Sequence, residues 1–270
     1  MVPVFASIEL LRLPFKRECS FPKCLPPITP TIHLVLQGKG GVGKSVVASW
    51  LAEFLVEQGQ TVRCIDGDPV NRSLAQFKAL DVEKADLLNQ EGVVLRCRYD
   101  ALVYRFLREE FVFVVDSGAT AFLLFWTYIM EADIVALLRS AGRRVYIHIP
   151  IGGGEMLNDT LLGFKTLAET AADKSLVVWI NEHFGPVARD GKTFDQMQVY
   201  LDNRDKVLAS IGLLERPQDT FGENVRRMRE RKLTLKEAIT TSPDFYVVER
   251  SRLFRVRSEL FEQLKQTPFA

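Results

Sequence analysis

The sequence predicts an α/β fold in which a doubly wound, mostly parallel sheet carries helices on both faces, giving three layers. Three observations support this prediction. Short apolar runs alternate with segments long enough for helical crossovers. The runs are almost continuously apolar, as in parallel strands that are buried on both faces. A glycine-rich turn joins the first run directly to an amphipathic segment.

The first element is a predicted strand around residues 32–36, and residues 47–55 carry apolar side chains at helical spacing. The turn between them satisfies the pattern G-x-x-x-x-G-K-S, in which backbone N–H groups wrap a phosphate chain and the lysine reaches its outer phosphates. The start of the helix is directed at the same anion, and Ser45 is placed to ligate Mg²⁺. We therefore predict a nucleotide-binding loop made of Gly38, Gly40, Gly41, Val42, Gly43, Lys44, Ser45 and Val46.

Further strands are predicted at VRCID (62–66), FVFVVD (111–116), VYIHI (145–149), LVVWI (176–180) and IGLLE (211–215). The first of these ends in Asp66 and Asp68, and the second ends in Asp116. Ligands of such sheets bind at the carboxyl ends of the strands. An isolated aspartate there would be a turn former or a helix cap. Beside a phosphate-binding loop, these carboxylates are instead expected at a Mg²⁺ site.

We expect a single domain over residues 31–270, preceded by a flexible, Pro-rich extension over residues 1–30. The extension lacks the pattern of a secretory signal. The uncharged stretch 117–130 is too short to cross a ~30 Å hydrocarbon core, so we interpret it as a core or interface helix. The cysteines contain no C-x-x-C pair and are expected to be free thiols, and the three histidines do not indicate a zinc site.

The stretch KGGVGKS (39–45) resembles the deviant phosphate-binding loop of the ParA/MinD family of P-loop ATPases. In that family the early lysine, here Lys39, reaches the nucleotide of the partner subunit, and the proteins close as ATP-sandwich dimers. The resemblance therefore implies ATP and Mg²⁺ as cofactors, ATP hydrolysis, and a homodimer that forms with ATP. It also implies catalytic roles for Lys39 and Lys44.

Two more motifs extend this resemblance. DGDP (66–69) is similar to switch I, which implies that Asp68 orients the attacking water and that Asp66 supports the metal site. DSGA (116–119) is similar to switch II, which implies that Asp116 holds magnesium through water. Gly118 stands where many relatives have proline, so a looser switch II is expected here.

Two later residues complete the expected nucleotide site. Asn181 follows the strand predicted over 176–180, where relatives use an asparagine amide to contact the adenine edge. Pro217 matches a proline-bearing loop that packs on the base. The alternatives are a turn-forming asparagine and an ordinary loop proline.

A narrower resemblance covers residues 31 to 270. The segments CIDGDPVN, AGRRVYIHIPIGGGEMLNDTLLGF, VVWINEHFGPV and DTFGENVRRM, together with the loop, are similar to TraL-type conjugal transfer proteins of plasmids. This resemblance implies a cytoplasmic ATPase of the conjugation machinery, with a relaxase or a coupling protein as a candidate partner.

The alternative function is a ParA-like partition or positioning ATPase that binds DNA or a DNA-bound partner. It is favoured by the basic stretch VRRMRERKLTLK (225–236), expected to be helical, although a solvated helix face explains the same residues. The net charge of +1 gives no overall reason to bind polyanions. An iron–sulfur ATPase would need cysteines after switch II, and a small-molecule enzyme is favoured only by analogy of fold.

The segment 251–266 is expected to be an amphipathic helix with Leu253, Val256, Leu260 and Leu264 on one stripe. Such a stripe serves either membrane attachment or packing against the domain. Packing is the favoured interpretation, because Glu259 and Glu262 offset the basic residues of the segment.

Overall fold

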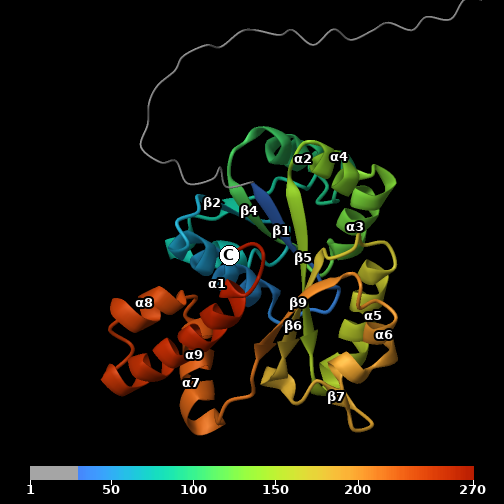
Figure 1. The fold of residues 1–270 in the computed structure, drawn as a ribbon. Helices are drawn as coiled ribbons and strands as arrows, with labels where there is room; N and C mark the ends of the chain where they lie inside the picture. Colours follow the sequence, from blue (N-terminus) through green and yellow to red (C-terminus); the bar gives the residue numbers. More distant parts are fainter. Residues whose placement is uncertain (1–29) are drawn as a thin grey trace, which may run out of the picture.

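The computed structural model describes residues 30–270, which fold around a sheet of seven parallel strands (Figure 1). Their order is β3-β2-β4-β1-β5-β6-β9, with β1 in the centre. The strands are β1 (Thr31–Val35), β2 (Val62–Asp66), β3 (Glu83–Lys84), β4 (Val112–Asp116), β5 (Arg144–Gly152), β6 (Leu176–Asn181) and β9 (Val207–Leu213). The prediction of a doubly wound parallel sheet is confirmed. Residues 1–29, with Cys19 and Cys24, lie outside the described part.

Helices cover both faces of the sheet, which confirms the three layers (Figure 1). One face carries α1 (Lys44–Glu57), α7 (Glu223–Glu230), α8 (Leu235–Thr240) and α9 (Val247–Lys265). The other carries α2 (Tyr99–Arg108), α3 (Phe122–Glu131), α4 (Ile134–Ser140) and α5 (Leu157–Ala168). The short α6 (Gln198–Leu201) and the hairpin of β7 (Ala188–Arg189) and β8 (Lys192–Thr193) lie on the side of α5. Side chains of β1 enter both cores in alternation, which explains its continuous apolar run.

The observed ends of the strands agree with the sequence prediction for two strands and differ for a third. β2 begins and ends as predicted, and β4 begins one residue later. The prediction of a strand over 211–215 was wrong at both ends, because β9 runs from Val207 to Leu213. Its limits follow from its pairing with β6, whose last matched pair is Asn181 with Leu213. The basic stretch 225–236 is not one helix either, since α7 ends at Glu230 and α8 begins at Leu235.

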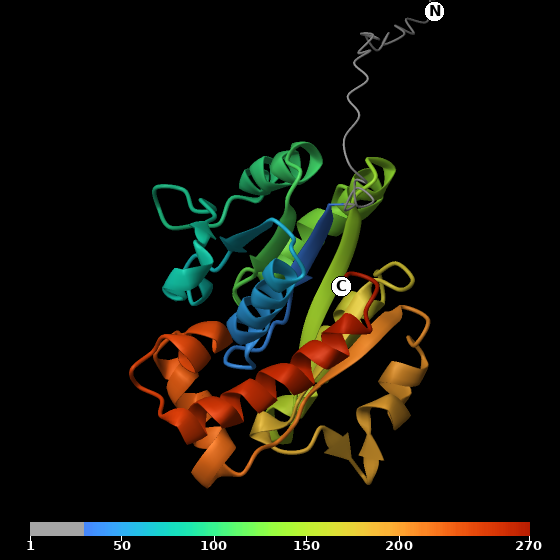
Figure 2. The ribbon, with the colours of Figure 1, turned by 60° about the vertical axis from the view of Figure 1, so that its left-hand side comes forward.

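The C-terminal helix α9 uses its apolar stripe for packing. Leu253, Val256, Leu260 and Leu264 are all buried. Figure 2 shows α9 lying alongside α1, where the rings of Phe54 and Phe261 meet edge to face at 5.3 Å. The predicted packing against the domain therefore accounts for this stripe.

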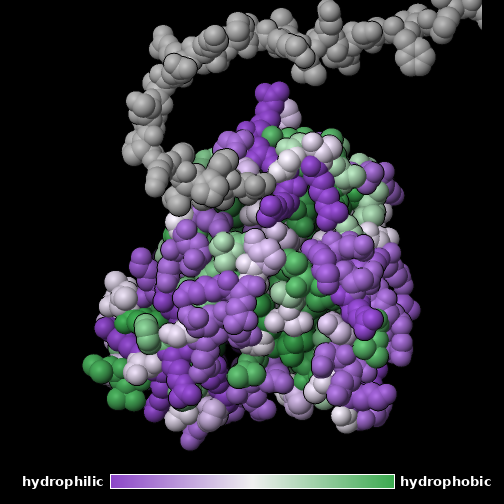
Figure 3. Space-filling model, in the orientation of Figure 1, coloured by the Kyte–Doolittle hydropathy of each residue, from purple (hydrophilic) through white to green (hydrophobic). Residues whose placement is uncertain are grey.

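The predicted core helix after Asp116 is confirmed in part. Residues 117–121 form a loop, and α3 follows with four buried apolar side chains, those of Phe122, Phe125, Trp126 and Ile129. Within residues 30–270, no helix combines the length and the apolar character needed to cross a membrane. Figure 3 shows a surface on which hydrophilic areas predominate and several apolar areas occur. The side chains of Tyr246, Val247 and Val248, where α9 begins, are exposed.

A chain of hydrogen bonds between buried side chains links three central strands. Trp179 Nε1 donates to His148 Nδ1 at 3.0 Å, so His148 is left to donate from Nε2 to His33 Nδ1 at 2.9 Å. His33 Nε2 in turn donates to Thr31 Oγ1 at 2.9 Å. These bonds require both imidazoles to be neutral. Burial lowers the pKa of His33 to about 3, and burial together with His33 lowers the pKa of His148 well below its ordinary value.

The two histidines should make the protein lose stability in acid. Their pKa values are lower in the folded than in the unfolded chain, so below about pH 6.5 the unfolded chain binds more protons and is favoured. Each histidine contributes a slope of up to about 1.4 kcal/mol per pH unit. We expect His33→Leu to reduce the slope of the unfolding free energy between pH 6.5 and 4.5 by about this amount. Urea denaturation at several pH values measures it.

Buried carboxyl groups with raised pKa values change stability in the opposite direction, but they are common to the variant and the wild type and cancel in the comparison. His183→Asn is the comparison variant, because His183 lies outside the hydrogen-bonded chain. Burial also lowers the pKa of His183, but its side chain is only partly buried, so the variant should leave most of the slope in place. Equal slopes for wild type and His33→Leu would show that His33 does not stay neutral in the folded protein.

Candidate functional site

The candidate site lies at the carboxyl-terminal edge of the sheet, where β1 leads into the glycine-rich loop. β4 pairs with both β1 and β2 in a register that aligns Asp116 with Val35 on one side and with Asp66 on the other. Three neighbouring strands therefore end at the same level. α1 begins at Lys44, directly after the loop. The parallel sheet thus brings both strand-end carboxylates beside the loop, as predicted from the sequence.

The loop is curved by residues in backbone conformations that glycine adopts most readily. Gly41 has a φ of 75° and Gly43 a φ of 100°. The buried side chain of Lys44 turns back toward the loop, and its Nζ donates to the carbonyl oxygen of Lys39 at 2.9 Å. The ammonium group is therefore held at the inside of the curve, where it could exchange a carbonyl partner for a phosphate oxygen.

Gln37, which sequence reasoning missed, braces the start of the loop. Its side chain is fully buried, and Nε2 donates to the carbonyl oxygens of Pro150 and Thr160, each at 3.1 Å. Its Oε1 accepts from the N–H of Gly38 at 2.9 Å. On α5, Gly163 leaves the necessary space, because a Cβ there would lie 1.9 Å from Oε1. No sequence signal distinguishes this glutamine, since its partners come from distant segments.

Asn181 braces the other end of the loop. Its Nδ2 donates to the carbonyl oxygen of Val42 at 2.9 Å, and its Oδ1 accepts from the N–H of His183 at 3.2 Å. Both ends of the amide thus have backbone partners, and Asn181 links β6 to the loop. Pro217 is exposed and precedes a short π-helical turn, Gln218–Gly222. Contact of Asn181 or Pro217 with a base stays a prediction.

The two aspartates of the DGDP segment order the backbone that follows β2. Asp66 accepts from the N–H groups of Asp68 at 2.9 Å and Ala75 at 2.8 Å. Asp68 accepts from the N–H groups of Val70 at 2.9 Å and Asn71 at 3.1 Å. The role of Asp66 in supporting a metal site stays a prediction. The carboxylate of Asp68 holds its own turn in this structure, and its contact with a water stays a prediction.

Asp116 is the carboxylate with an unused acceptor. Its Oδ1 is buried and has no hydrogen-bond partner among residues 30–270. Burial raises the pKa of Asp116 to about 7, against the opposing effects of the Ser45 hydroxyl and the Lys44 ammonium. Burial lowers the pKa of Lys44, while Asp116 and Asp68 oppose that change. A buried acceptor without a partner fits a ligand that binds there.

The described part of the chain contains no ready-made group of three or more His, Cys, Asp or Glu side chains for a metal ion. Mg²⁺ in nucleotide sites does not need one, because it is usually held by one or two protein oxygens, waters and phosphates. The Ser45 hydroxyl and the unpartnered oxygen of Asp116 are oxygen ligands of the kind that Mg²⁺ takes.

Gly118 is required by its contact with Asp68. A Cβ at this position would lie 2.6 Å from Asp68 Cγ. The carboxylate of Asp68 is held in place by Val70 and Asn71, so it could not move aside without loss of hydrogen bonds. The segments that follow β2 and β4 therefore approach each other closely at Gly118. This contact explains why glycine stands here, where many relatives have proline.

Lys39 does not approach the carboxylates of the site. Its Nζ forms an ion pair with Asp159 of α5 at 2.6 Å, and both side chains are partly exposed. A shallow cavity beside them is lined by Gly38, Leu123 and Leu162, of which the two leucines are exposed. The side chain of Lys39 is thus engaged with α5.

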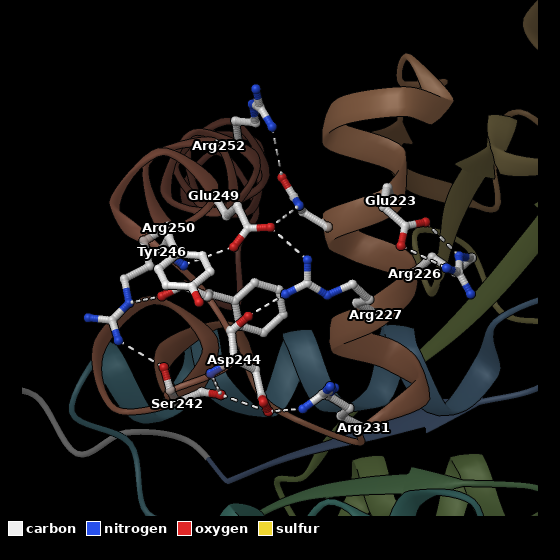
Figure 4. Close-up of polar contacts among 12 residues, drawn as sticks. Glu223, Arg226, Arg227, Arg231, Ser242, Asp244, Tyr246, Glu249, Arg250 and Arg252 are labelled. Carbon is white, nitrogen blue, oxygen red and sulfur yellow. Dashed lines mark hydrogen bonds and ion pairs between the residues drawn. The ribbon is translucent and has the colours of Figure 1, made fainter.

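Most arginines of the basic stretch 225–236 are engaged in ion pairs. Figure 4 shows three of its four arginines in ion pairs: Arg226 with Glu223, Arg227 with Glu249, and Arg231 with Asp244. Arg226 also pairs with Glu230. Charge pairing of this kind leaves little net positive charge for a phosphate backbone.

Comparisons with known proteins agree with this geometry. A family model described as the CobQ/CobB/MinD/ParA nucleotide binding domain matches residues 33–228. Two proteins of Escherichia coli, each named Protein TraL, are similar over most of the chain. One is 37% identical over 234 residues, which are 86% of this chain and 96% of that protein. The other is 36% identical over 235 residues, which are 87% and 97% of the two chains.

Among solved structures, a chain of the MinC:MinD cell division protein complex of Aquifex aeolicus is similar with 14% sequence identity and a TM-score of 0.49. The match covers 84% of this chain and 96% of that chain.

The contact between Gly118 and Asp68 can be tested through stability. Gly118→Ala should lower the free energy of unfolding by about 1–3 kcal/mol, because the added methyl group displaces a hydrogen-bonded carboxylate. In an Asp68→Ala background the same change should cost much less, since the clash is gone. Denaturant melts of the four proteins in this cycle measure the coupling.

Gly40→Ala is the matched control, because a Cβ at Gly40 meets nothing within 4 Å, and it should change the unfolding free energy little. An equal cost of Gly118→Ala in both backgrounds would contradict the contact.

Proposed function

This chain belongs to the TraL-type branch of the CobQ/CobB/MinD/ParA family of nucleotide-binding proteins, and from that we propose that it is an ATP-hydrolysing switch in plasmid conjugal transfer. It would bind ATP with Mg²⁺ in the cytoplasm, close as an ATP-dependent homodimer, and hydrolyse ATP slowly. A relaxase or a coupling protein is the proposed class of partner.

The observation that carries this proposal is the buried ammonium group of Lys44 at the inside of the glycine-rich loop. It hydrogen-bonds the loop carbonyl of Lys39, and Asp116 and Asp68 act on it electrostatically. A cation in this position offers a triphosphate a charge-assisted bond, and the N–H groups at the start of α1 add to it. Gly41 and Gly43 allow the backbone to approach the phosphates closely.

The residues present fit a magnesium ion. Ser45 and Asp116 would hold it, the serine directly and the aspartate through water, and the unpartnered Oδ1 of Asp116 supports this assignment. When bound, the ion would neutralise negative charge on the phosphates of ATP. Asp68 would orient the attacking water, which requires its carboxylate to exchange at least one of its hydrogen bonds in the turn of Val70 and Asn71.

The proposed dimer gives Lys39 its role. Lys44 already supplies a cation within the subunit, so Lys39 is free to act on the nucleotide of a second copy. Its ion pair with Asp159 is partly exposed, and such pairs contribute only about 0–1 kcal/mol. Release from Asp159 would therefore cost little. The exposed side chains of Leu123 and Leu162 beside it support a protein contact at this face.

The role in conjugal transfer rests on the likeness to the TraL proteins, which extends over almost their whole length. The alternative of a DNA-binding partition ATPase loses its main support, because the arginines of α7 and the following turn are largely paired with carboxylates.

Lys44→Ala should leave the fold intact and weaken binding of ATP by about 2 kcal/mol or more, which is a rise in Kd of about 30-fold, because a charge-assisted bond to the phosphates is lost. Calorimetry with Mg²⁺ and ATP measures it. Asp68→Ala is the contrasting variant, expected to bind ATP and fail in hydrolysis. Unchanged affinity of Lys44→Ala for ATP would refute the assignment of the loop.

The same Lys44→Ala allele separates the two cellular roles. Carried on the plasmid, it should lower transfer to recipient cells and leave inheritance by daughter cells unchanged. Loss of inheritance with normal transfer would favour partition instead.

Lys39→Ala should bind ATP almost normally, yet neither hydrolyse it nor dimerise stably with it. A cation acting in trans contributes about 10³ to 10⁵ in rate where arginine fingers have been measured. Gel filtration with a slowly hydrolysed analogue and specific activity at several protein concentrations test this. Lys165→Ala, which removes an exposed lysine of α5, is the control. A wild type that stays monomeric with the analogue and hydrolyses ATP at a concentration-independent specific rate would exclude the dimer.

A further inference from the structure

A hollow of about 210 Å³ opens beside the first turn of α1. Its walls come from α1, from the carboxyl ends of β6 and β9, and from α7 and α9. They are mainly apolar, with Val46, Leu213, Val225, Val256 and Leu260 among the lining residues, and Gly43 connects the hollow to the glycine-rich loop. A ligand whose phosphates lie in the loop would thus extend its remaining part into this space.

Two donors of the hollow lack acceptors. The side chains of Arg229 and Trp50 both line it, and within residues 30–270 neither Arg229 Nε nor Trp50 Nε1 has a hydrogen-bond partner, although both atoms are buried. The indole and the guanidinium can only donate. Other arginines of this layer differ, since the close-up in Figure 4 shows Arg226, Arg227 and Arg231 in ion pairs.

The charge of Arg229 is costly where it lies. Burial lowers the pKa of Arg229, and the nearby Glu230 only partly opposes this effect. The acidic residue that lines the hollow, Glu259, is engaged by Arg216 and Arg255. Buried donors without acceptors destabilise a protein unless a ligand supplies the acceptors. The ligand of this hollow should therefore be planar, largely apolar and rich in hydrogen-bond acceptors.

We propose that Arg229 and Trp50 bind the ring nitrogens of a purine base in this hollow. A purine offers flat apolar faces to the aliphatic walls and acceptor nitrogens at its edge to the two donors. This inference rests on the proposed function, because it needs the triphosphate of the same nucleotide in the loop.

The test compares two ligands in calorimetry with Mg²⁺: ATP, and tripolyphosphate, which has no base. Arg229→Met keeps an unbranched apolar side chain and removes the donors, and it should raise the Kd of ATP about tenfold while that of tripolyphosphate stays unchanged. Trp50→Phe keeps an aromatic ring and removes the N–H, and a rise of about fivefold for ATP alone is expected. Arg226→Met, on the same helix and outside the hollow, should change neither constant.

The thermal melt of Arg229→Met excludes a structural role. Removal of a guanidinium whose Nε is buried without a partner should leave the melting temperature equal or higher, and a variant that unfolds would overturn the inference. So would unchanged affinity for ATP, or an equal loss of affinity for both ligands, which would assign Arg229 to the phosphates. None of these outcomes would contradict the binding of ATP by the glycine-rich loop. A wild type that binds neither ligand would instead overturn the proposed function, and this inference with it.

Discussion

The pairing of β4 with both β1 and β2 is the constraint on which the candidate site depends. Its register sets Asp116 level with Val35 and Asp66. The carboxylate of Asp116 therefore lies at the end of the strand between β1 and β2, beside the glycine-rich loop. A shift by one residue would turn this side chain to the opposite face of the sheet. The burial that raises the pKa of Asp116, and its position beside Ser45 and Lys44, follow from this register.

Buried polar side chains are of two kinds, those with hydrogen-bond partners in the protein and those with an atom that has none among residues 30–270. Gln37, Asn181 and the His33–His148 pair are deeply buried, and each of these side chains has hydrogen-bond partners within the protein. By contrast, Asp116 Oδ1, Trp50 Nε1 and Arg229 Nε are buried without partners in the described part of the chain, and all three belong to residues around the loop. One is an acceptor on the side of the proposed metal ion, and two are donors on the side of the hollow. Glu53 Oε2, Gln60 Oε1 and the Tyr99 hydroxyl are also buried without partners among residues 30–270. The position of the first three atoms beside the loop, and not the missing partner alone, therefore points to a binding site.

Some sequence patterns are compatible with two structural roles, and only the contacts in the folded protein show which role applies. The stripe of α9 suits a lipid surface or a protein core equally well, and it packs next to α1. The arginines after residue 225 suit DNA or acidic side chains, and their partners Glu249 and Asp244 come from outside α7. The limits of β9 likewise depend on β6, whose pairing partners a pattern of apolar residues along one chain does not specify.

The fold class, the loop from Gly38 to Ser45 and the carboxylates at two strand ends could all be predicted before the structure was known. Each depends on a local pattern: the period of apolar residues, the spacing of glycines, or an aspartate at the end of an apolar run. Which polar groups have hydrogen-bond partners became clear only from the folded chain. There Gln37 and Asn181 brace the loop, Gly118 lies against Asp68, and Arg229 Nε is left without an acceptor among residues 30–270. The reason is physical: the energy of a buried polar group depends on its partners, and here those partners come from segments far apart in the chain.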